Sequence, residues 1–176
     1  MAKPSYGQLV QLNELRDLVV SIMSDMVIWR DHDLSQLYDI ELGVLRRNAT
    51  QRHGVTRWKK GVSGDELTLE NIDTIELHPE LLFQQWNPYA AFVLHHEFIH
   101  ALGYREHNTV FRSLEHSWPG LNAGELGPKF TEYLRRKSAK WLWVCHDCDT
   151  EFPRKKPSNG GFRCRRCGTV LIDVKL

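Results

Sequence analysis

The four cysteines of this chain lie close together near its end, in two CxxC pairs. Cys145 and Cys148 form the first pair, and fifteen residues separate them from Cys164 and Cys167. This spacing is typical of a zinc ribbon, in which two hairpin turns each present two thiolates to one tetrahedral Zn²⁺. Because such a site has no open position, its ion is structural and supplies most of the folding free energy of so small a unit. The pattern predicts a Cys₄ zinc ribbon over residues 141–176.

A second metal-binding pattern lies in the stretch HHEFIHALGYREH, residues 95–107. His96, Glu97 and His100 form HExxH, and two histidines four residues apart share one face of a helix and can bind one ion. Glu97 then lies beside a zinc-bound water, whose pKa falls to about 7, and acts as the general base of peptide hydrolysis. Without a partner, such polar groups inside an apolar helix would each cost about 1 to 3 kcal/mol. The motif therefore predicts a catalytic zinc site.

A catalytic zinc site needs a third protein ligand and an open fourth position. The candidates are Glu106 and His107, because Gly103 can end the helix in a left-handed turn and let the chain return toward the ion. Spacing alone does not choose between them. A helix expected to start near His107 would point this side chain inward while Phe111 anchors it in the core. We therefore predict His107 as the third ligand, with Glu106 as the alternative.

Charge is distributed unevenly along the chain. Residues 1–128 carry 11 Lys and Arg against 17 Asp and Glu, whereas residues 129–176 carry 12 against 5. This change predicts a metal-binding domain over 1–128, a basic helical linker over 129–140 and the ribbon after it.

The ribbon combines basic residues with aromatic ones, a mixture that suits phosphate contacts and stacking on unpaired bases. The basic residues are Arg154, Lys155, Lys156, Arg163, Arg165 and Arg166. We predict that they contact nucleic acid, most simply single-stranded or damaged DNA. The alternatives are a solvated basic surface and, for Phe152 and Phe162, a place in the small core of the ribbon.

Apolar spacing and turn residues predict an α+β fold. The expected elements are an amphipathic helix over residues 9–29, a short helix over 34–45, two or three strands between 44 and 82, the HExxH helix over 87–103, a short helix over 108–118 and a basic helix over 127–141. Asn87 is the expected N-cap of the HExxH helix. His95 lies about 100° round that helix from His96, so we expect it to flank the site or lie at the surface.

No apolar run reaches the roughly 18 to 20 residues needed to span a bilayer, and the start MAKPSYGQLVQLNELRD has no apolar signal-peptide region. We expect a cytoplasmic protein, associated with the nucleoid or nucleus if it acts on DNA.

Taken together, these motifs resemble the SprT-like zinc metalloproteases, the family that includes the DNA–protein crosslink protease Spartan. The resemblance rests on HExxH at 96–100, on HNTVF from His107, and on the ribbon WVCHDCDTEFPRKK…FRCRRCGTVL. It implies a zincin-like domain with a small three-stranded sheet, zinc bound by His96, His100 and His107, and Glu97 as the catalytic base. It also implies proteolysis of proteins bound or crosslinked to DNA, with the ribbon as the nucleic-acid-binding element.

Two other functions would use the same histidines or the same ribbon. The histidine spacing also resembles bacterial endoribonucleases that mature ribosomal RNA, but those have Gly at the position of Glu97 and a third His one residue earlier than His107. A non-enzymatic nucleic-acid adaptor would have no need for Glu97 as a base.

Overall fold

The computed structural model describes residues 3–64, 67–120 and 123–176. The chain divides into two compact units, Met1–Ala123 and Gly124–Leu176. The first combines helices with a three-stranded sheet, and the second contains another three-stranded sheet and the four cysteines. The expected mixture of helices and small sheets, with the cysteines clustered near the C-terminus, is confirmed. The predicted domain limits at 128 and 140 stay a prediction.

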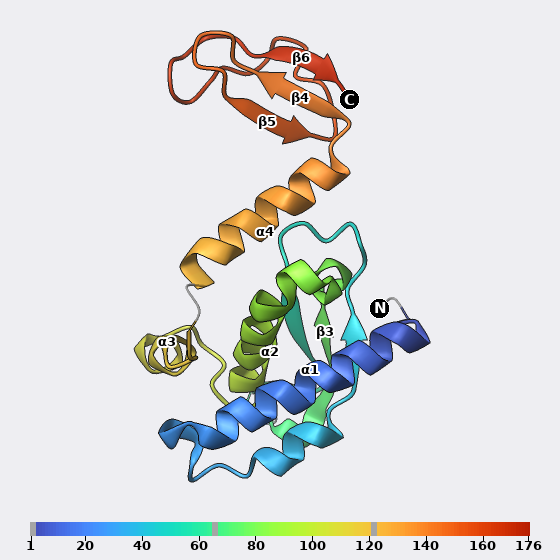
Figure 1. The fold of residues 1–176 in the computed structure, drawn as a ribbon, viewed down its shortest axis with the longest axis vertical. Helices are drawn as coiled ribbons and strands as arrows, with labels where there is room; N and C mark the ends of the chain where they lie inside the picture. Colours follow the sequence, from blue (N-terminus) through green and yellow to red (C-terminus); the bar gives the residue numbers. More distant parts are fainter. Residues whose placement is uncertain (1–2, 65–66, 121–122) are drawn as a thin grey trace. The chain divides into compact units, whose positions relative to one another are not determined.

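Helix α1 (Tyr6–Asp25) belongs to the first unit (Figure 1), and its apolar face is buried in the core of that unit. A capping box starts it, in which the Ser5 hydroxyl accepts from the Gln8 N–H and the Gln8 side chain accepts from the Ser5 N–H. Its buried residues are Leu12, Leu15, Val19, Val20 and Met23. The predicted helix to residue 29 is too long, because Met26 is extended and a 3₁₀ turn, η1 (Val27–Trp29), buries Trp29 instead.

The sheet of the first unit has the order β1 (Leu42–Val44), β3 (Ile72–Leu77), β2 (Gly54–Trp58), with β1 parallel and β2 antiparallel to β3. The expected helix over residues 34–45 is therefore wrong in its second half. Residues Leu34–Asp39 form the 3₁₀ helix η2, but the chain then enters the sheet. Pairing with β3 satisfies the backbone of β1 and buries it fully, which outweighs helical preference. Among the described residues, β2 is a terminal strand that pairs only with β3, which leaves its other edge free.

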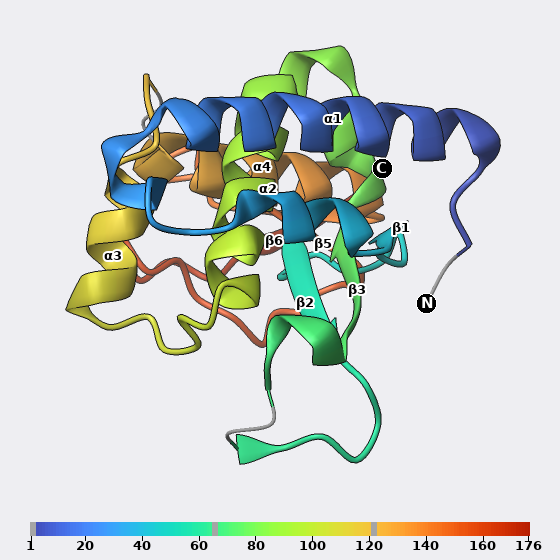
Figure 2. The same cartoon turned by 90° about the horizontal axis from the view of Figure 1, so that it is seen from below.

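Three short 3₁₀ helices flank β3 in the sequence. η4 (Leu69–Asn71) precedes this strand, and η5 (Pro79–Leu82) and η6 (Gln84–Trp86) follow it. Described residues 59–64 and 67–71 extend beyond the ends of β2 and β3 (Figure 2).

Helix α2 (Asn87–Ala101) carries the HExxH motif and packs on α1 and on the sheet. Its N-cap is Trp86 and not Asn87, which already has helical angles, so the predicted cap lies one residue late. Gly103 has a φ of +100°, as expected for the residue that ends the helix. Helix α3 (Thr109–His116) follows, with the Asn108 side chain capping it by accepting from the Phe111 N–H.

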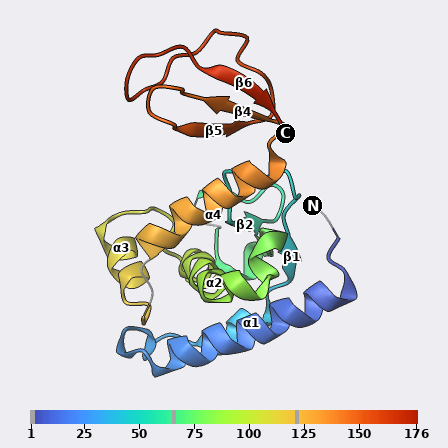
Figure 3. The ribbon, with the colours of Figure 1, turned by 45° about the horizontal axis from the view of Figure 1, so that its top comes forward.

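All of α4 (Ala123–Ser138) except its first residue belongs to the second unit, and this helix contains most of the predicted linker. Three antiparallel strands follow: β4 (Trp141–Val144), β5 (Glu151–Arg154) and β6 (Ile172–Lys175). β4 lies between the other two (Figure 3). Within the described parts of the chain, none of the helices combines the length and apolarity needed to cross a membrane.

Candidate metal centre

Three histidines meet at one point between α2 and the loop that follows it. His107 Nε2 lies 3.2 Å from His96 Nε2 and 3.2 Å from His100 Nε2. The structure thus brings the three predicted ligands together, and among the described residues Glu106 does not join this group. Such a cluster can hold a metal ion, and its role as a ligand set stays a prediction.

Two of these histidines are oriented through their other ring nitrogen. His96 Nδ1 lies 2.7 Å from Glu115 Oε1, and Arg112 Nη1 donates to the second oxygen of that carboxylate at 2.7 Å. His100 Nδ1 lies 2.9 Å from the carbonyl oxygen of Tyr104. A carbonyl and an ionised carboxylate can only accept, so each Nδ1 carries the hydrogen in the neutral ring. The Nε2 lone pairs of both rings therefore face the cluster, as metal-bound histidines require.

The arrangement fits a tetrahedral ion. Ligand nitrogens about 2.0 to 2.1 Å from a tetrahedral Zn²⁺ lie about 3.3 Å apart, close to the distances seen here. Burial lowers the pKa of His100 to about 4 and, with nearby His96, also lowers the pKa of His107. Neutral imidazoles are the metal-binding form. The Nε2 lone pairs converge on one point, and too few hydrogens are available there for the rings to hydrogen-bond to one another. A cation at this point removes the repulsion between the lone pairs, so the residues present fit a zinc ion.

Phe111 supports all three rings from α3. It is fully buried, and its ring centroid lies 4.9, 4.7 and 4.6 Å from those of His96, His100 and His107. The expectation that Phe111 anchors its helix in the core is confirmed. His107 itself is exposed and precedes α3, so it reaches the cluster through the turn at Gly103.

The choice between His107 and Glu106 leads to a direct test. Replacing His107 with Ala should lower zinc content from about two to about one ion per chain, because three ligands are the minimum for a stable catalytic site. Replacing Glu106 with Ala should leave zinc content unchanged. Metal analysis of the purified variants measures both, and equal loss in the two variants would contradict the assignment.

Glu97 lies beside the cluster and contacts β2. Its Oε2 accepts a hydrogen bond from the Thr56 hydroxyl at 2.8 Å. Burial raises the pKa of Glu97, while His96 and the Thr56 hydrogen bonds oppose that shift. A base whose pKa rises toward neutrality transfers protons more effectively.

Gly54 provides the space for this carboxylate. A Cβ at this position would lie 2.6 Å from Glu97 Oε1 and 2.8 Å from Val93 Cγ1. Because β2 is held in register by β3, the clash falls on the Glu97 side chain rather than on the strand.

We therefore expect Gly54→Ala to displace Glu97 and reduce hydrolysis by about 10- to 100-fold with little change in metal content. Steady-state kinetics and metal analysis measure this. Gly61→Ala tests general effects of glycine replacement: nothing lies near its added Cβ, although its positive φ adds local strain. Equal activity of Gly54→Ala and the wild type would contradict this role of Gly54.

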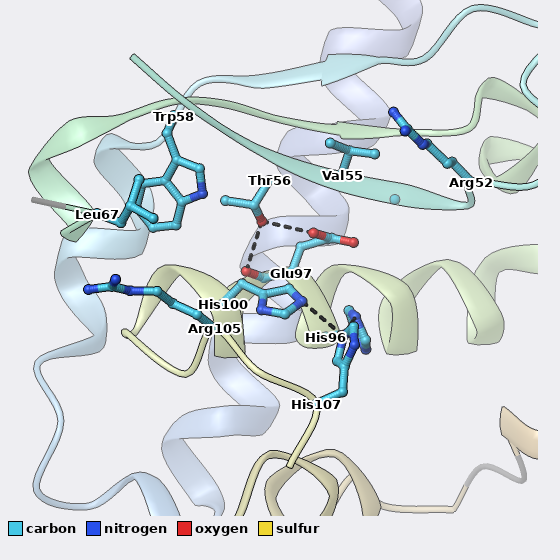
Figure 4. A pocket seen from close by; sticks show the side chains of 11 residues that line it. Arg52, Val55, Thr56, Trp58, Leu67, His96, Glu97, His100, Arg105 and His107 are labelled. Carbon is cyan, nitrogen blue, oxygen red and sulfur yellow. Dashed lines mark hydrogen bonds between the residues drawn. The ribbon is translucent and has the colours of Figure 1, made fainter. Parts of the chain in front are cut away.

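The cluster opens into a cleft of about 480 Å³ between β2 and α2 (Figure 4). Glu97 and the three histidines line it from α2 and the following loop. From the other side it is lined by Val55, Thr56, Trp58 and Leu67. The site is therefore reachable by a substrate that lies along the free edge of β2.

His95 points away from this cleft into the core. It is fully buried, with its ring 6.0 Å from that of Trp29 and 4.7 Å from that of Trp118. The surface alternative for His95 is wrong, because Trp29 of η1 and Trp118 after α3 pack against this side of α2.

The four cysteines also gather at one point. The Sγ atoms of Cys145 and Cys167 lie 3.2 Å apart, and Cys148 Sγ lies 3.6 Å from Cys164 Sγ and 3.8 Å from Cys167 Sγ. All four are free thiols within reach of a single ion. Sulfur ligands of a tetrahedral zinc lie about 3.8 Å apart, so the cluster fits a Cys₄ zinc site.

The six basic residues predicted to contact nucleic acid lie on the second unit, where one stacks on an aromatic ring and the other five are exposed. Arg154 stacks over the ring of Trp143 at 4.9 Å, and Trp143 in turn stacks on Phe162 at 4.4 Å. Phe162 is about half exposed, so its predicted place in the ribbon core is wrong, whereas Phe152 packs on that core. Lys155, Lys156, Arg163, Arg165 and Arg166 are all exposed. Their role in binding stays a prediction.

The sequence pattern missed the residues that position the histidines and Glu97. Glu115 and Arg112 lie on α3, well after HExxH in the sequence, and form no motif of their own. Thr56 and Gly54 lie on β2, and only the adjacency of that strand to α2 reveals them. The closely spaced Arg112 and Glu115 after His107 offered a weak signal.

Comparison with known proteins finds curated relatives named Protein SprT-like. The one from Streptococcus equi subsp. equi (strain 4047) is 29% identical over 110 residues, which cover 58% of this chain and 66% of that protein. Those from Streptococcus equi subsp. zooepidemicus, strains H70 and MGCS10565, are 29% and 28% identical over the same shares. The match thus spans just under two thirds of the length of these relatives.

No family model matches the chain, and no solved structure matches it. The curated relatives nevertheless agree with one another in name, in identity and in the share that they cover. Their similarity over 58% of this chain supports membership of the SprT-like family.

Proposed function

We propose that the chain is a zinc-dependent endopeptidase with a zincin-like domain. The observation that carries the proposal is the position of Glu97 in the same cleft as His96, His100 and His107, whose Nε2 atoms meet at 3.2 Å. A structural zinc site has no use for a buried carboxylate beside its ligands. The similarity to proteins named SprT-like supports the same chemistry.

The residues of the cleft have separate roles in this proposal. A zinc ion held by the three histidines would polarise the scissile carbonyl and acidify a water molecule. Thr56 holds Oε2 of Glu97, which leaves Oε1 to take a proton from the attacking water and pass it to the leaving amine. Glu115 and the Tyr104 carbonyl fix the orientation of His96 and His100.

The free edge of β2 supports a peptide as the substrate. Residues of β2 line the cleft, and β3 pairs with only one side of this strand. An extended peptide can add to such an edge through backbone hydrogen bonds that do not depend on its sequence. A peptide bound in this way would have its backbone beside Glu97 and the histidines.

We further propose that the protein acts on proteins bound or crosslinked to DNA, as the resemblance to Spartan implies. Trp143 and Phe162, which stack on one another, and Arg154 over the Trp143 ring suit an unpaired base and its phosphate. The exposed basic residues around the cysteines would contribute further phosphate contacts.

The proposal is tested by incubating the full chain with a DNA-binding protein, free and bound to single-stranded DNA, in the presence and absence of a zinc chelator. We expect chelator-sensitive cleavage that is faster when DNA is present. Structured RNA is offered in parallel. Cleavage of RNA and not protein would overturn the proposal, and chelator-sensitive proteolysis that DNA does not affect would retain the peptidase and remove the DNA role.

A further inference from the structure

Two arginines line the cleft on opposite sides of Glu97. Arg52 precedes β2 at one end of the strand, and Arg105 follows the turn at Gly103 near the other end, beside Trp58 (Figure 4). Both side chains belong to exposed residues. A substrate that follows β2 through the cleft therefore passes one guanidinium group on each side of Glu97.

Neither guanidinium group is neutralised within the described parts of the chain. No hydrogen bond or ion pair to a described residue occupies Arg52, and Arg105 donates only to the Gly64 carbonyl oxygen. By contrast, Arg57 pairs with Glu76 at 2.6 Å and Arg112 pairs with Glu115 at 2.7 Å. Among the described residues, neither of these two cationic groups thus has a carboxylate partner.

The rest of the lining is apolar or uncharged. Val55, Trp58 and Leu67 offer apolar contacts, and Glu97 is the one acidic residue among the described residues that line the cleft. Because Glu97 is committed to the reaction, no other carboxylate among the described lining residues is available to the arginines, and a substrate can supply one. Guanidinium groups bind carboxylates through paired, charge-assisted hydrogen bonds.

We propose that Arg52 and Arg105 make this a protease selective for acidic side chains on both sides of the cleaved bond. The inference rests on the proposed peptidase function. A nucleic-acid backbone is the other polyanion that such groups could hold. It is disfavoured here because its phosphates would pass the Glu97 carboxylate, and because the free edge of β2 is matched to a peptide backbone.

The expected change in cleavage depends on how exposed Arg52 and Arg105 are. Ion pairs that water can reach contribute little each, so every arginine should change cleavage by about two- to tenfold, and salt should weaken the preference. The two effects should combine nearly additively in free energy, since the groups lie at opposite ends of the cleft.

The test compares three series of peptides that are identical except next to the cleaved bond, where they carry acidic residues, the corresponding amides or lysines. The wild type is compared with Arg52→Glu, Arg105→Glu and the double variant, with Arg52→Gln and Arg105→Gln to separate charge loss from charge reversal. Arg30→Glu, an exposed change outside the cleft, is the matched control. Binding of the same peptides to zinc-loaded Glu97→Gln protein, by fluorescence anisotropy, gives a second measurement that needs no turnover.

We expect the wild type to prefer the acidic over the amide peptides. Each charge reversal should move that preference to lysine on one side of the bond, and Arg30→Glu should behave as the wild type.

Equal cleavage and binding of the three series, or ratios that the variants do not change, would overturn the inference and leave the peptidase proposal intact. If no peptide is cleaved, the peptidase proposal fails, and the binding series still decides the preference. Loss of single-stranded DNA binding in the variants, without any change in peptide preference, would assign the arginines to phosphate and overturn it as well.

Discussion

Replacing Glu97 with Gln is expected to reduce peptide hydrolysis by about 10²- to 10⁴-fold, the range typical of a lost general base. Gln has nearly the same shape as Glu and can still accept from the Thr56 hydroxyl, so the helix and the three histidines should keep their positions. It cannot take a proton from water. Steady-state kinetics on a cleaved peptide, with metal analysis of the same sample, measure the effect.

The expected metal content of Glu97→Gln is that of the wild type, about two zinc ions per chain. This separates loss of the base from loss of the ion, because a ligand variant such as His100→Ala should lose both activity and one zinc. Thr56→Val is a useful companion, since it removes the hydrogen bond to Glu97 and should cause a smaller loss of activity. Full activity of Glu97→Gln would remove the proposed catalytic role.

Replacing Cys164 with Ser is expected to remove the second zinc ion and unfold the ribbon. The Cys164 side chain is buried, and the cluster of cysteines forms a core with Leu171, so little else holds this end of the second unit together. Structural zinc sites contribute about 10 to 16 kcal/mol to the folding of such small modules. Metal content should fall to about one ion per chain, and near-UV circular dichroism should lose the signal of Trp141 and Trp143 on β4.

The matched control is His146→Ala, since His146 is exposed and lies between the ligands Cys145 and Cys148 without joining the cysteine cluster. It should keep both zinc ions and the folded signal. Peptide hydrolysis should persist in Cys164→Ser, because the histidine cluster belongs to the first unit. A Cys164→Ser protein with two zinc ions would contradict the assignment of a Cys₄ site.

Local patterns predicted the helices with the strongest signals. The spacing of Leu12, Leu15 and Val19 set the buried face of α1, and Gly103 ended α2 as expected. The same reasoning failed for residues 42–44, which read as helix but form β1. A short apolar segment has no strong preference of its own, and pairing with β3, more than twenty residues later in the sequence, decides it.

By itself, the sequence determined the parts of the two metal sites that are close together in the chain. Helical periodicity fixes His96 and His100 on one face with Glu97 beside them, and each CxxC pair is set by one tight turn.

Only the tertiary structure decided what surrounds them. The return of His107, the hydrogen bond from His96 to Glu115, the space left by Gly54 and the two arginines across the cleft all join segments that are distant in sequence. Their positions depend on how α3 and β2 pack against α2. Such packing follows from the burial of the whole core, which no local spacing encodes.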